Sequence, residues 1–212
     1  TPTLVTTSSA NPSVLGQPTS FTATLTSIGG TPTGTVIFTV NGTDLAAATL
    51  NGSGSVTVSA PALAVGTYPV TARYSGDTNF NTVTGTLPGG QTVGKADTSL
   101  VLTSNSSSAS FGGTTVFTAT VSPVAPGAGT PGGTVIFSID GTAQPAATLD
   151  GSGIATISRT GLGVGTHAVT AAYAGTTSFN PSSGTLSGGQ VVVAAASTTT
   201  LTITPTTASF GD

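Results

Sequence analysis

Very few residues of this 212-residue chain have side chains that could do chemistry. It contains six acidic residues, all aspartates, with three Lys or Arg, one His and no Cys. Hard cations such as Ca²⁺ bind where several oxygen ligands gather. Asp77, in a Gly-Asp-Thr-Asn run, and Asp97, between two repeated segments, come closest, but neither has a second carboxylate nearby in sequence. We predict no metal site and name Asp77 and Asp97 as the candidate ligands to test.

The single histidine does not belong to a recognisable catalytic set. His167 stands 99 residues after Tyr68 at a matching position, and no nucleophile with a fixed partner accompanies it. A general base needs a proton donor within hydrogen-bonding reach. An amphipathic side chain at the rim of a strand accounts for both residue types. We predict no catalytic residue, no cofactor and no enzyme activity.

The chain is a repeat of one unit. Residues 34–38 (Gly-Thr-Val-Ile-Phe) return at 133–137, and Phe111-Gly112 returns as Phe210-Gly211, both after 99 residues. Repetition on this scale indicates one small domain used in series. We predict a first domain, a second domain and the first strand of a third, incomplete repeat, at residues 1–96, 97–196 and 197–212.

Apolar and hydroxylated residues alternate within each copy, which predicts short strands with one buried face. Residues 21–25 run Phe-Thr-Ala-Thr-Leu, and residues 117–121 run Phe-Thr-Ala-Thr-Val. Turn signals follow every 8–12 residues or so, a spacing typical of a β-sandwich. We predict an all-β fold with about seven strands in each copy and no helix.

Two tight hairpins are predicted at matching positions. Asn41-Gly42 and Asp140-Gly141 each end an apolar strand, and such pairs supply the two positive φ angles of a type I′ turn. Because Asp140 aligns with Asn41, a turn role explains it better than cation binding. We also expect one continuous returning strand after the first hairpin, across residues 46–50.

Composition excludes several classes of partner. The net charge is −3 and only 4% of residues are charged, which leaves no basic patch for nucleic acid or an anionic membrane. No apolar run approaches the length that crosses a bilayer. A chain without Cys or Met suits an oxidising environment. We predict an extracellular or cell-surface protein with no nucleic-acid partner and no membrane insertion in this sequence.

The segment at residues 63–80, Leu-Ala-Val-Gly-Thr-Tyr-Pro-Val-Thr-Ala-Arg-Tyr-Ser-Gly-Asp-Thr-Asn-Phe, has a close counterpart at 162–179. Both resemble the C-terminal signature of bacterial Ig-like domain repeats, and the Gly-Thr-Val-Ile-Phe segments also fit. The resemblance covers both copies and the start of the third. It implies immunoglobulin-like β-sandwiches of Greek-key type, found in tandem in large bacterial surface and secreted proteins. It implies no catalytic residues.

Some surface Ig-like domains carry a side-chain cross-link, which raises a covalent alternative here. Gln91 and Gln190 recur at the same place on the predicted last strand, and threonine is plentiful on the first. A threonine–glutamine ester would require a positioned base. The acidic and imidazole helpers do not recur with these glutamines, so we expect no cross-link.

We predict that the array is a semi-rigid stalk or a fibre, because the links between copies are only a few residues long. Its partners are then neighbouring repeats and, in a fibre, other copies of the chain. Ile37 and Ile136 occupy the outward side of the same strand in both copies. A recurrent exposed isoleucine predicts a lateral contact between domains or chains.

Three alternatives remain at this point. The array could be an adhesin that binds a host or carbohydrate ligand through residues 122–129, a loop three residues longer than its counterpart at 26–30. It could be an accessory module of a large secreted enzyme. Residues 197–212 could instead be a strand donated to a neighbouring subunit. We favour an incomplete repeat, because neither full copy lacks a strand.

Overall fold

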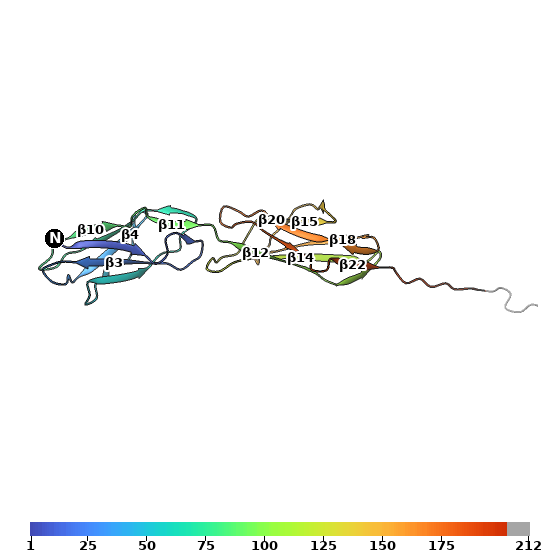
Figure 1. The fold of residues 1–212 in the computed structure, drawn as a ribbon, viewed down its shortest axis with the longest axis horizontal. Coiled ribbons are helices and arrows are strands. Elements are labelled where there is room, and N and C mark those ends of the chain that lie inside the picture. The colour runs from blue at the N-terminus through green and yellow to red at the C-terminus, as the bar shows by residue number, and fades with distance from the viewer. Residues whose placement is uncertain (203–212) are drawn as a thin grey trace, which may run out of the picture.

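The computed structural model describes residues 1–202, and no helix occurs among them. Two β-sandwiches follow one another along the long axis of the molecule (Figure 1). Strands β1 to β11 form the first domain, and β12 to β22 form the second. Each domain has its own hydrophobic core. The predicted all-β fold with two tandem sandwiches is confirmed.

The first domain has eleven strand segments. They are β1 (Thr3–Ser8), β2 (Ser13–Val14), β3 (Ser20–Thr26), β4 (Thr35–Val40), β5 (Thr43–Asp44), β6 (Ala48–Thr49), β7 (Ser55–Ser59), β8 (Gly66–Tyr68), β9 (Val70–Tyr74), β10 (Val83–Thr86) and β11 (Gln91–Gly94). One sheet has the order β1-β3-β7, and another has the order β10-β9-β4-β5, with β6 also paired to β4. A third sheet has the order β2-β11-β8. If β1 is counted with β2, β5 with β6, β8 with β9 and β10 with β11, the eleven segments fill seven strand positions.

The second domain repeats this plan. Its segments are β12 (Thr98–Ser104), β13 (Ser108–Ser110), β14 (Thr114–Pro123), β15 (Thr134–Ile139), β16 (Thr142–Ala143), β17 (Ala147–Thr148), β18 (Ile154–Thr160), β19 (Gly165–His167), β20 (Val169–Tyr173), β21 (Ser182–Thr185) and β22 (Gln190–Val193). The three sheets have the orders β12-β14-β18, β16-β15-β20-β21 and β13-β22-β19. Ser197 to Thr202, at the start of the predicted third repeat, are exposed and outside any strand. The remainder of that prediction lies outside the described residues.

Aromatic residues from facing sheets form the centre of each core. Phe21 on β3 and Phe38 on β4 are fully buried, and their ring centroids lie 6.2 Å apart. Burying a side chain of this size contributes about 1.5–3 kcal/mol. Tyr74 is also buried, and its hydroxyl donates a 2.5 Å hydrogen bond to the carbonyl of Thr33. The predicted alternation of buried and outward residues along β3 and β4 is therefore present.

Both predicted hairpins have the backbone of a two-residue turn with positive φ. Asn41 and Gly42 have φ of 49° and 80°, between β4 and β5. Asp140 and Gly141 have φ of 49° and 79°, between β15 and β16. Asn, Asp and Gly tolerate this left-handed region better than other residues.

The expected continuous strand across residues 46–50 is wrong. Two short segments, β5 and β6, pair with β4, and Ala46 between them is exposed. The amide of Leu45 still donates to Phe38, after which the chain leaves the sheet until Ala48. This is the edge of the sheet, where one side of the strand has no partner and packing does not enforce continuity. In the second domain Pro145 stands in the same gap and has no amide hydrogen to donate.

Candidate functional site at the domain junction

The link between the two domains is almost fully structured. Strand β11 ends at Gly94, and Ala96 is already buried in the core of the second domain. The amide of Ala96 donates to Ser178 at 3.1 Å, and its carbonyl accepts from Asn180 at 2.9 Å. Only Lys95 therefore lies between the last strand of one domain and the first buried residue of the next.

A loop of the second domain packs directly on the first domain. The amide of Ala128 donates a 3.0 Å hydrogen bond to the carbonyl of Leu15. The Leu15 side chain packs against the core of the second domain. Gly16 has φ of +76°, and a Cβ at this position would lie 2.7 Å from the Cβ of Ala128. Glycine is required here because the two backbones approach too closely for any side chain.

This loop, residues 122–129, is the longer loop that the adhesin alternative places in contact with a ligand. Its Gly127 lies so close to the link that an added Cβ would be 2.7 Å from the Cβ of Ala96. The amide of Val124 donates to the carbonyl of Asp97 at 2.8 Å. The loop thus holds the junction together, and this contact provides a structural reason for its three extra residues.

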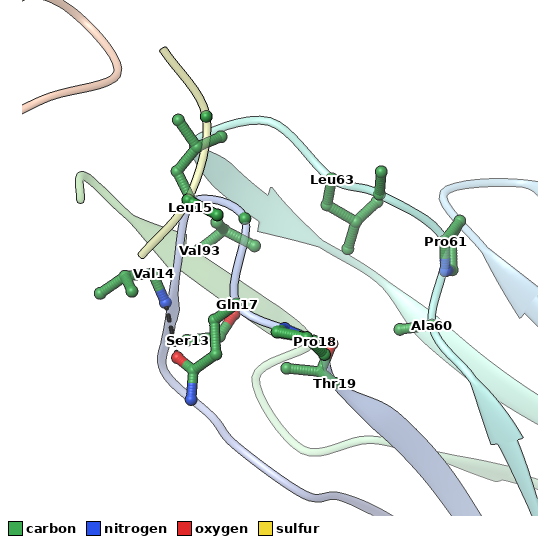
Figure 2. A pocket seen from close by; sticks show the side chains of 14 residues that line it. Ser13, Val14, Leu15, Gln17, Pro18, Thr19, Ala60, Pro61, Leu63 and Val93 are labelled. Atoms are coloured by element: carbon green, nitrogen blue, oxygen red, sulfur yellow. Dashed lines mark hydrogen bonds between the residues drawn. The ribbon is translucent and has the colours of Figure 1, made fainter. Parts of the chain in front are cut away.

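The junction contains an open groove of about 440 Å³. Figure 2 shows Leu15 and Val93 on one side of the opening, with Ala60, Pro61 and Leu63 on the other. Ala128 and Gly129 contribute from the second domain. None of the residues that line the groove is charged or a histidine. A general acid or base therefore has no place on its walls.

The two recurrent glutamines are fully buried and hold the first strand segment against the last. Gln91 Oε1 accepts a 2.6 Å hydrogen bond from the Ser8 hydroxyl. Its Nε2 donates to the carbonyl of Ala10 at 2.9 Å and to Ser13 Oγ at 3.1 Å. In the second domain the Ser104 hydroxyl donates to Gln190 Oε1, also at 2.6 Å. A buried amide with these partners satisfies its polar atoms.

This arrangement bears on the covalent alternative. The hydroxyl that meets each glutamine belongs to a serine, whereas the expected partner was a threonine. Each hydroxyl donates to the amide oxygen, and none of the hydrogen-bond partners of Gln91 and Gln190 is an acid or an imidazole. An ester would need a base to activate the hydroxyl. The geometry is that of a hydrogen-bonded latch between strands.

His167 pairs with an aspartate of the neighbouring hairpin turn. Its Nδ1 lies 2.6 Å from Asp140 Oδ2, and its Nε2 lies 2.9 Å from the carbonyl of Gly163. The hydrogen bond to Asp140 is the main cause of the raised pKa of His167, and the same bond lowers the pKa of Asp140. Both ring nitrogens can donate only when the imidazole is protonated. The pair ties β19 to the turn before β16.

Asp77 organises its own loop. Its Oδ2 accepts from the amide and hydroxyl of Thr33, at 2.8 and 2.9 Å, and its Oδ1 accepts from the amides of Asn79 and Phe80, both at 2.8 Å. The hydrogen bond from the Thr33 amide is the largest cause of the lowered pKa of Asp77. Asp77 thus joins two loops at the far end of the first domain.

Asp97, the second candidate ligand, lies at the junction. Its Oδ1 accepts a 2.7 Å hydrogen bond from the side-chain amide of Asn180. Within residues 1–202, no three His, Asp or Glu side chains lie together as a metal site would require. Nor does that part of the chain contain a helix long and apolar enough to span a membrane.

The two isoleucines of the predicted lateral contact differ in exposure. Ile136 is exposed, at 45%, whereas Ile37 is half-buried. Directly across the sheet, Ile37 faces Arg73 and Ile136 faces Ala172. Directly opposed side chains interact across a sheet, so the long arginine has no equivalent beside Ile136. The second domain therefore presents the more open apolar patch.

The fold and the junction define a tandem array of immunoglobulin-like β-sandwiches joined end to end. The chain belongs to the bacterial Ig-like domain family (group 3), whose sequence profile matches residues 5–93 and 102–193. The resemblance inferred from the sequence is confirmed for both copies. A comparison with curated protein sequences finds no significant match.

Several solved structures are similar to this chain. Invasin, a bacterial integrin-binding protein, is 16% identical, with a TM-score of 0.53 over 87% of this chain and 38% of that one. The fibronectin(III)-like modules of Clostridium thermocellum CbhA are 17% identical, with a TM-score of 0.34 over 89% of this chain and 95% of theirs. A 1.5-MDa bacterial ice-binding adhesin is 15% identical, with a TM-score of 0.38 over 91% of this chain and 66% of that one. The likeness to invasin shows the fold alone.

Proposed function

We propose that this chain is a non-enzymatic spacer, part of a semi-rigid extracellular stalk in a bacterial surface or secreted protein. The proposal is supported mainly by the short and braced connection between the two domains. Lys95 is the only residue between the two structured domains, and the loop at 122–129 is hydrogen-bonded to Leu15. A connection this short, braced by a second contact, limits the swing of one domain relative to the other.

The strand order also suits a domain that bears load. In each domain a short segment near the start of the domain runs parallel to the last strand: β2 beside β11, and β13 beside β22. Tension applied through the two termini loads the hydrogen bonds of such a pair together. The buried latches of Gln91 and Gln190 connect the first strand segment to the same last strand.

Several features favour a spacer over a ligand-binding module. The loop at 122–129 is engaged at the junction, and the groove beside it has no charged lining. The placement outside the cell is supported by membership of the bacterial Ig-like family. A spacer of this kind would serve equally in a stalk or in an accessory module of a secreted enzyme.

A second candidate function is lateral assembly into a fibre. The Ile136 side chain is 45% exposed on the outward side of β15. The chain also has few charged residues to oppose association. The partner in this case is another copy of the chain, with the two β15 faces in contact.

The stalk proposal is tested by small-angle X-ray scattering on the 212-residue chain. We expect a maximum dimension that matches two domains end to end and a narrow distribution of interdomain angles. Pulling the chain by its termini should give one high-force unfolding event per domain. A broad distribution of angles, or unfolding at forces too low to detect, would contradict the proposal.

A further inference from the structure

Three exposed apolar side chains gather at the end of the second domain that lies away from the junction. Phe111, Val164 and Val193 are 54%, 62% and 46% exposed. The amide of Phe111 donates to the carbonyl of Val193 at 2.8 Å, and Val164 precedes Gly165, which pairs with Val192. We call the surface made by Phe111, Gly112, Val164 and Val193 the Phe111 face. Grouped apolar exposure of this kind is typical of an interaction site.

The first domain shows what covers the same surface. Leu15 is the equivalent of Phe111, and its amide donates to Gly94 at 2.9 Å, as that of Phe111 does to Val193. There the loop of the following domain lies against the surface: Leu15 packs on the core of that domain, and Ala128 lies against Gly16. Val65, the equivalent of Val164, is half-buried.

The backbone at Gly112, in the Phe111 face, has the same left-handed conformation as the backbone at Gly16. Gly112 has φ of +82°, close to the +76° of Gly16. At Gly16 an added Cβ would meet Ala128 of the following domain, whereas at Gly112 no atom of the described residues lies within 4 Å of that position. Gly16 and Gly112 thus share a left-handed backbone, and within the described part of the chain only Gly16 lies against a residue of a following domain.

The contact at the first junction comes from the longer loop of the second domain. Ala128 of this loop meets Leu15 and Gly16, whereas its apolar residue Val124 stays 44% exposed. The first-domain loop at residues 26–30 is three residues shorter. A repeat that docks in the same way therefore needs the longer form of the loop.

We propose that the Phe111 face is a docking surface for a further Ig-like repeat, which seats on it the loop equivalent to residues 122–129. The proposal rests on the spacer function and deepens it by naming the contact that sets the angle between repeats. Residues 194–196 match the link at 95–97 in length, and Leu201 follows Leu102 by 99 residues. A repeat that starts there is held at the distance found at the first junction. An amide of its loop then donates to the carbonyl of Phe111, as Ala128 does to Leu15.

The experiment compares the 212-residue chain with an extended chain in which a second copy of residues 97–196 follows Ala195, so that Ala194 and Ala195 take the places of Lys95 and Ala96. That segment has a closed core of its own. Hydroxyl-radical labelling with mass spectrometry reports the exposure of Phe111. We expect its labelling to fall by roughly half or more in the extended chain, as apolar contacts replace solvent. Val101, 59% exposed on the outward side of β12, should keep its labelling and serves as the matched control.

Two variants of the extended chain sharpen the result. Phe111→Ser should broaden the angle between the second and third domains in small-angle scattering, and Val101→Ser should not. Unchanged Phe111 labelling in the extended chain would overturn the docking proposal. So would concentration-dependent protection of Phe111 in the 212-residue chain, which would assign the face to another copy. The angle between the first two domains is read separately, so a flexible first junction would contradict the spacer function instead.

Discussion

The Ser8 hydroxyl donates a 2.6 Å hydrogen bond to Gln91 Oε1 across 83 residues of sequence. The same relationship joins Ser104 to Gln190 in the second domain. Both amides are completely buried. A buried hydrogen bond thereby joins the first strand segment of each domain to its last strand. Such a bond fixes the relative position of the two strands, which contact between two apolar side chains would not do.

Replacing Gln91 with alanine should destabilise the first domain by about 1–3 kcal/mol, because buried partners lose their hydrogen bonds. The loss leaves Ser13 Oγ and the carbonyl of Ala10 without this donor. Denaturant unfolding followed by hydrogen exchange of each domain's amides measures the effect. Gln190→Ala should cost less, because within residues 1–202 Gln190 Nε2 donates only to Val191. Equal losses of unfolding free energy in the two domains would show that the hydrogen bonds from Gln91 to Ala10 and Ser13 add no stability.

Replacing Gly16 with alanine should open the junction. The new methyl group would collide with Ala128, in addition to straining a backbone with φ of +76°. Gly112→Ala is the matched control, because Gly112 has nearly the same φ but no neighbour among residues 1–202 within 4 Å of an added Cβ. Both variants should lose about 1 kcal/mol or more from backbone strain. Only Gly16→Ala should broaden the interdomain angle measured by small-angle scattering or residual dipolar couplings.

The pair of His167 and Asp140 should make the second domain's stability depend on pH. The pKa of His167 is raised above 6.5, so its contribution is complete below that pH and is lost as pH rises through the raised value. The pKa of Asp140 is lowered from 3.8, so its contribution is lost as pH falls through the lowered value. The thermal unfolding midpoint of the second domain should therefore fall as the pH is raised from about 5 to about 9. His167→Tyr, the first domain's residue at this position, should remove it.

Chelation of divalent cations should leave both unfolding midpoints unchanged. The carboxylate of Asp77 accepts hydrogen bonds from Thr33, Asn79 and Phe80, and Asp97 accepts one from Asn180. A hard cation needs several oxygen ligands, and no acidic cluster occurs in residues 1–202. Calorimetry with excess calcium and then with EDTA checks this. A midpoint that rises with calcium and is abolished by Asp77→Asn would instead assign a cation to this loop.

Ile136→Lys should prevent lateral association if the chain forms fibres. A charged side chain on the outward side of β15 would repel its counterpart in a facing copy. The half-buried Ile37 of the first domain should tolerate Ile37→Lys with a smaller effect on assembly. Electron microscopy and analytical ultracentrifugation at high protein concentration measure the outcome. Fibres that persist in the double variant would exclude this face as the contact.

Some of the candidate site could be predicted from sequence because it depends on local chemistry. Asn41-Gly42 and Asp140-Gly141 specify their turns within a few residues, since positive φ is a property of the residue itself. The recurrence of Gln91 and Gln190 marked them as special, but their partners Ser8 and Ser104 could not be recognised. Serine is common in this chain, and spatial proximity across more than 80 residues leaves no local pattern.

The sequence by itself determined the sandwich fold, the two-copy organisation and the buried faces of the strands, because alternation and turn chemistry are local and occur twice. The tertiary structure alone decided the broken edge strand around Ala46 and the use of the 122–129 loop as a brace on Leu15. It also decided which isoleucine is open to solvent. These features depend on what lies opposite each residue, as Arg73 does for Ile37, and only the folded chain brings such residues together.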